Sequence, residues 1–134
     1  YPDDIYVIEE VVSHMKTKGY IIKNKYSVPQ TLAVIGKMDM LIGMRLHALI
    51  FAASSGVPII GLAYEPKIEG FLQYTNQSSA GNVTQLEFDK IKSIVDDVWL
   101  NRAEISEQLK KDVEVLKRKA LENAKIAVGL IEED

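Results

Sequence analysis

The sequence contains no cysteine, no run of basic residues and no long apolar segment. The lack of cysteine excludes a disulfide framework and thiolate metal sites. No stretch approaches the roughly 20 apolar residues of a membrane span, and no signal peptide is visible. A net charge of −3 without Lys/Arg clusters argues against a nucleic-acid partner. The glycines form neither a GxGxxG motif nor a P-loop, so we expect no dinucleotide site of the usual kind.

What the sequence does contain is typical of a soluble globular domain. Its 134 residues suffice for one domain with a core, and 47% of them are apolar. The chain begins at Tyr1 without an initiator methionine, and residues 1–4 read as the run into a helix. We therefore expect a fragment of a longer protein.

Periodicity predicts helices that alternate with short apolar strands. The predicted segments are a helix to about residue 18 that is stopped by Gly19, a strand at 20–22, a helix capped by Ser27, a strand at 39–43, a helix at 44–55 closed by Gly56, a strand at 58–62, a helix at 66–74, a loop at 77–84 with one edge strand near 82–83, and two long amphipathic helices at 87–100 and 102–131. Such alternation indicates βαβ units, so the predicted fold class is α/β, with a doubly wound parallel sheet.

Two strand-to-helix turns carry the candidate chemistry. Arg45 and His47 follow the strand at 39–43, and Lys67 follows the strand at 58–62. The intervening helix descends about 15 Å and the next strand climbs about 17 Å, so Lys67 should return to the edge that His47 left. Ligands of open parallel sheets bind at this carboxyl edge. We therefore expect the three residues to gather into one cationic pocket.

The position of these cations favours a bound anion. A helix N-terminus is already positive, so a cation there costs about 0.3–1 kcal/mol unless an anion binds. Taken singly, Arg45 and Lys67 are typical of solvated surface residues, and His47 is typical of a core histidine whose hydrogen bonds are made. Only the combination of the three favours a functional site. His14 is predicted to be a surface residue and Trp99 a core anchor.

Residues 38–53, continued by 56–68 and 70–72, resemble the central signature of the polysaccharide pyruvyl transferase family. The closest resemblance is to bacterial enzymes that pyruvylate secondary cell-wall polymer. The family has two Rossmann-like domains in a GT-B-like arrangement, with the active site between them. By resemblance, residues 1–134 are the C-terminal, donor-binding domain, and the N-terminal domain with its acceptor contacts is absent. We expect this domain alone to be inactive.

The resemblance implies transfer of pyruvate from phosphoenolpyruvate to a cell-wall polysaccharide sugar as a ketal. His47 and Lys67 match donor-binding positions, His47 is the candidate catalytic acid, and Arg45 lies in the same motif. Glu65 stands where the family has Asp, and Glu65 and Tyr64 are further candidates. The implied partner is a lipid-linked or polymeric sugar acceptor. The implied location is the cytoplasm, with peripheral association at the inner membrane face left open.

Two other functions remain open at this point. One is the nucleotide-sugar domain of a GT-B glycosyltransferase, which shares the fold. The other is a non-catalytic doubly wound interaction module, although Asp39 lies at the wrong end of its strand for a phospho-acceptor. No cofactor is expected, and no metal, because no His/carboxylate cluster has ligand spacing.

Overall fold

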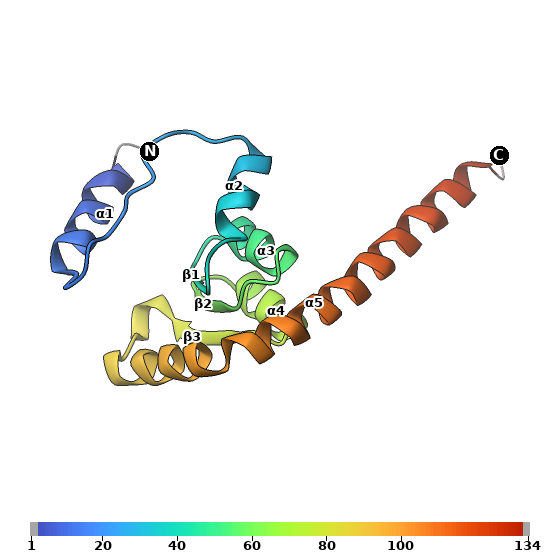
Figure 1. Ribbon diagram of the computed structural model, residues 1–134. Helices are drawn as coiled ribbons and strands as arrows, with labels where there is room; N and C mark the ends of the chain where they lie inside the picture. Colours follow the sequence, from blue (N-terminus) through green and yellow to red (C-terminus); the bar gives the residue numbers. More distant parts are fainter. Residues whose placement is uncertain (1–2, 133–134) are drawn as a thin grey trace.

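The computed structural model describes residues 3–132 and shows an α/β fold with one parallel sheet (Figure 1). Its elements in chain order are α1 (Asp3–His14), α2 (Val28–Ile35), β1 (Leu41–Gly43), α3 (Leu46–Ser54), β2 (Ile59–Ala63), α4 (Pro66–Tyr74), β3 (Ser78–Asn82), the 3-10 helix η1 (Val83–Gln85) and α5 (Phe88–Glu132). The predicted run-in at Tyr1 and Pro2 lies outside the described residues.

The sheet has the order β1-β2-β3, and both neighbouring pairs are parallel. Leu41 lies opposite Ile59, and Ile60 lies opposite Ser78. The central strand β2 is almost entirely buried, as expected for a parallel strand covered on both faces. The predicted α/β class with a parallel sheet is therefore confirmed.

Two apolar clusters lie on opposite faces of β2. Ile59 and Ala63 face a cluster built with α2, α3, α4 and the middle of α5. Ile60 and Leu62 face a second cluster that the first part of α5 covers. Because successive strand residues point to opposite faces, one five-residue strand serves both clusters. Helices therefore lie on both sides of the sheet.

Glycines at two positions shape the helices around β2. Gly56 has φ +70 and follows the last turn of α3, where it closes the helix as predicted. Gly61 lies in β2 beneath α4, and a Cβ there would collide with the side chain of Leu72. The small residue therefore permits the close approach of α4 to the sheet.

The expected strand at residues 20–22 is wrong. Tyr20 is 82% exposed and Ile22 is 56% exposed, and neither belongs to a strand. An apolar run of this length becomes a strand only when a sheet edge pairs with it. The helix before it also ends earlier than expected, at His14, where the side chains of Ser13 and His14 lie within hydrogen-bonding distance of the Glu10 carbonyl.

β3 extends further than the edge strand expected near residues 82–83. It spans Ser78–Asn82, although Ser, Gly and Asn are poor strand formers. Burial explains the outcome, because Ala80 is 4% exposed and packs between the sheet and α5. Small side chains here let the helix lie close against the strand.

The two expected C-terminal helices form one continuous helix, α5. The Asn101 side chain donates to the backbone and carboxylate oxygens of Asp97, so its polar group is satisfied inside the helix. The prediction that Trp99 is a core anchor is also wrong. Trp99 is 45% exposed, with the Arg102 guanidinium 4.2 Å from its ring centroid. In Figure 1, α1 and the end of α5 lie away from the sheet on different sides.

We predict that Leu109→Ala lowers the free energy of unfolding by about 2–5 kcal/mol. Leu109 is fully buried between α5 and the α3/α4 side of the sheet, so its removal leaves a cavity. Leu121→Ala is the matched control, because Leu121 lies on the same helix but is 62% exposed. Urea unfolding followed by circular dichroism measures both. Equal losses in the two variants would show that α5 is not anchored at Leu109.

Candidate functional site

The carboxyl ends of β1 and β2 lie side by side and begin the candidate site. Arg45 is the N-cap residue of α3, and His47 lies in the first turn of that helix. Lys67 lies in the first turn of α4. Because β1 and β2 are adjacent and parallel, both helices start at the same edge of the sheet. All three predicted cationic residues are exposed at this edge.

Two of the cations have carboxylate partners. An Nη2 atom of Arg45 lies 3.4 Å from Oδ2 of Asp4 in α1. Nζ of Lys67 lies 2.6 Å from Oε2 of Glu65. The hydrogen bond and the charge of Glu65 raise the pKa of Lys67 above its ordinary value. Lys67 is therefore fully protonated at neutral pH.

The start of α3 has no built-in acceptor among the described residues. Arg45 makes no side-chain capping bond, and the first turn contains no acidic residue. The Ala48 amide donates to the Arg45 carbonyl at 2.9 Å, so the amides of Leu46 and His47 are the ones left in this turn for an external anion. The start of α4 differs, because Glu65 precedes it and Glu69 lies in its first turn.

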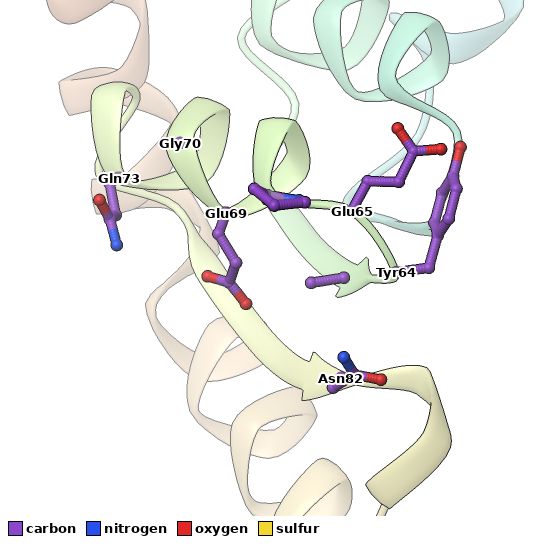
Figure 2. Close-up of a pocket in the computed structure, with 8 residues that line it drawn as sticks. Tyr64, Glu65, Glu69, Gly70, Gln73 and Asn82 are labelled. Atoms are coloured by element: carbon purple, nitrogen blue, oxygen red, sulfur yellow. The ribbon is translucent and has the colours of Figure 1, made fainter.

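A cleft of about 500 Å³ lies between α4 and the end of β3, and Glu65, the partner of Lys67, is part of its wall (Figure 2). Its lining residues are Ala63, Tyr64, Glu65, Pro66, Glu69, Gly70, Gln73 and Asn82. Two expected candidates, Tyr64 and Glu65, therefore line it. Arg45, His47 and Lys67 do not, so the cations lie outside this cleft.

The sequence-based prediction missed the cleft residues Glu69, Gln73 and Asn82. A signal was present on α4, where residues 66, 69, 70 and 73 follow the i, i+3, i+4, i+7 spacing of one helix face. After Pro66, that face carries glutamate, glycine and glutamine instead of large apolar residues. Asn82 gave no such signal, because its place depends on β3 and the prediction left that region mostly as loop.

The comparison with known families agrees with the signature around β1 and α3. Residues 1–66 match the family model of Polysaccharide pyruvyl transferase. This match supports the assignment of residues 1–66 to the polysaccharide pyruvyl transferase family. The match covers 66 of 134 residues, and it includes Arg45 and His47 but ends one residue before Lys67. No significant match to a curated protein or to a solved structure was found.

Two further properties of the chain concern metal binding and membrane spanning. Within residues 3–132, no group of three His, Cys, Asp or Glu side chains is placed to hold a metal ion. No helix of the same range combines the length and the apolar character needed to cross a bilayer.

We predict that Glu65→Gln lowers the pKa of Lys67 toward its ordinary value, because Glu65 is the main cause of the shift. The raised pKa means that the pair stabilises the fold below the ordinary lysine pKa and stops doing so as pH rises through the raised value. NMR titration of the Lys67 side chain measures the change. Asp96→Asn is the control, because it frees the similarly exposed Lys92 on α5. An unchanged pKa of Lys67 in Glu65→Gln would contradict the pairing.

Proposed function

We propose that this chain binds phosphoenolpyruvate at the carboxyl edge of β1 and β2 and takes part in transferring its pyruvyl group to a cell-wall polysaccharide sugar. The observation that carries the proposal is the position of Arg45 and His47 at the uncapped start of α3, inside the stretch that matches the family. Lys67 is included in the proposed donor site because α4, which carries it, starts at the same edge of the sheet.

The charges at this edge suit a donor with two anionic groups. Phosphoenolpyruvate carries a phosphate and a carboxylate on a three-carbon frame. Arg45 offers a planar fork of donors, and Lys67 offers a compact positive charge. Their present partners, Asp4 and Glu65, are exposed, and exposed ion pairs contribute only about 0–1 kcal/mol. A ligand that brings its own charge can therefore replace them.

In the proposed reaction, a proton adds to the methylene carbon and creates positive charge at C2. One sugar hydroxyl forms a bond to C2, and its proton returns to the group that protonated the methylene carbon, which restores that acid. The bond between C2 and the phosphate oxygen then breaks, and its electron pair leaves with the phosphate. A second hydroxyl of the same sugar closes the ketal, and its proton leaves with the phosphate.

His47 is the proposed proton donor, either to the methylene carbon or to the departing phosphate. Arg45, Lys67 and the first-turn amides of α3 would stabilise the charge that develops on the phosphate as it leaves. Fixed donors aimed at developing charge are usually the largest catalytic contribution. In this proposal the chain is the donor-binding half of a two-domain enzyme, and a second domain completes the active site.

We predict that His47→Ala and Lys67→Ala each weaken phosphoenolpyruvate binding by roughly 10- to 100-fold. A hydrogen bond to a charged group contributes about 1.5–3 kcal/mol, and each variant removes one. Calorimetric titration measures the affinity, and ketal formation by the enzyme that contains this chain measures the transfer. UDP-glucose serves as the control ligand and should not bind.

The matched control variants are His14→Ala and Lys92→Ala. His14 is an exposed histidine on α1, and Lys92 is an exposed, carboxylate-paired lysine on α5. Both should bind phosphoenolpyruvate as the unchanged chain does. Unchanged affinity and ketal formation in His47→Ala and Lys67→Ala would refute the donor site, and binding of UDP-glucose in place of phosphoenolpyruvate would favour a glycosyltransferase.

A further inference from the structure

The cleft between α4 and β3 has a chemistry opposite to that of the cationic edge beside it. Two carboxylates, Glu65 and Glu69, and two amides, Gln73 and Asn82, line it together with the ring of Tyr64. Its lining includes no lysine, arginine or histidine among the residues that the structure describes. A phosphorylated or carboxylated ligand would meet like charges here, which disfavours binding.

An uncharged, hydroxyl-rich ligand fits the same groups. Carboxylate oxygens only accept hydrogen bonds, amides both donate and accept, and sugar hydroxyls can do both. Tyr64 is 41% exposed and offers an apolar ring face beside these polar groups. The volume of about 500 Å³ lies within the roughly 300–1,000 Å³ of small-molecule sites.

Contacts within the protein hold two of the polar groups in place. The Ser79 hydroxyl on β3 donates to Oε1 of Glu69 at 2.8 Å, and the Gly81 amide donates to the same hydroxyl at 3.1 Å. Oδ1 of Asn82 accepts from the backbone and hydroxyl of Thr84, so its amide nitrogen is the group left to donate. Figure 2 shows Tyr64 and Glu65 toward one end of the cleft and Gln73 toward the other, with Glu69 between them and Asn82 across from them on β3. The Glu69 carboxylate points toward β3, whereas the Glu65 carboxylate points away from Asn82.

We propose that this cleft binds the acceptor saccharide, as an uncharged pyranose held through its hydroxyls between α4 and β3. The role as acceptor rests on the proposed donor function at the neighbouring edge. It places part of the acceptor site on this chain, in addition to the N-terminal contacts that the family resemblance implies. The two sites share a wall, because Glu65 lines the cleft while its carboxylate contacts Lys67. A sugar in the cleft therefore lies next to Lys67, one of the cations that are proposed to hold the donor.

Gly70 provides a direct steric test. It lines the cleft within α4, and a Cβ built on it meets no heavy atom within 4 Å. The Cβ of Gly70→Leu therefore meets no clash, the rest of the side chain occupies cleft space, and leucine is a better helix former than glycine. Gly129→Leu is the matched control, because Gly129 also lies in a helix, on α5, with open space around it.

The experiment titrates the ¹⁵N-labelled chain with methyl glucoside, methyl galactoside and methyl mannoside, and follows amide shifts by NMR. Methyl glucuronide is the charged control and glycerol the control for unspecific hydroxyl binding. At least one neutral pyranoside should bind saturably and shift residues 64–73 and 82. Gly70→Leu should weaken that binding about tenfold or more, whereas Gly129→Leu should leave it unchanged. Circular dichroism checks that both variants remain folded.

Glu69→Gln adds a readout that does not depend on shape. Removing this negative charge should narrow the preference for the neutral glucoside over the glucuronide by about tenfold. Absence of saturable pyranoside binding, shifts confined to other residues, or equal affinity in Gly70→Leu would overturn the cleft assignment. Phosphoenolpyruvate titrated in parallel keeps the two proposals apart. If phosphoenolpyruvate shifts residues 45, 47 and 67 but no sugar binds, only the cleft proposal is rejected. If a sugar binds but phosphoenolpyruvate causes no such shifts, only the donor-site proposal is rejected.

Discussion

The parallel pairing of β1 with β2 is the constraint on which the candidate site depends. It makes α3 and α4 begin at the same edge of the sheet, although Arg45 and Lys67 are separated by a helix and a strand. The pairing is secured by β2, whose two faces are both buried, one by α3 and α4 and the other by α5. Loss of either cover would expose apolar strand residues and release the helix starts.

The second organising feature is the separation of charge along this edge. The start of α3 presents cations and amide donors without an acidic residue, whereas the start of α4 presents Glu65 and Glu69. Lys67 and Glu65 lie at the boundary and pair with each other. Neighbouring regions of opposite charge suit two substrates of different chemistry, one anionic and one neutral, better than a single ligand that spans both.

The sequence predicted the segment from β1 to α4 to within a few residues, because each signal there is local. Apolar runs, Gly56 and Pro66 set the ends of those strands and helices without reference to the rest of the chain. It failed where tertiary contacts decide. The run at residues 20–22 has no strand partner, and β3 is a strand because of its burial against α5. The cations could be predicted because they directly follow apolar strands. The cleft could not, because one of its walls is β3.

The exposure of the cations is a property that a substrate site at this edge requires. A buried ion pair carries a desolvation cost of several kcal/mol per ion, and breaking it leaves an uncompensated charge. The pairs of Arg45 with Asp4 and of Lys67 with Glu65 are both exposed, so water solvates each partner when the pair opens. Their carboxylates can therefore hold the cations in position in the empty protein, and an anionic ligand that binds the cations more tightly can replace them. A buried pair would have stabilised the same geometry but would have resisted any ligand.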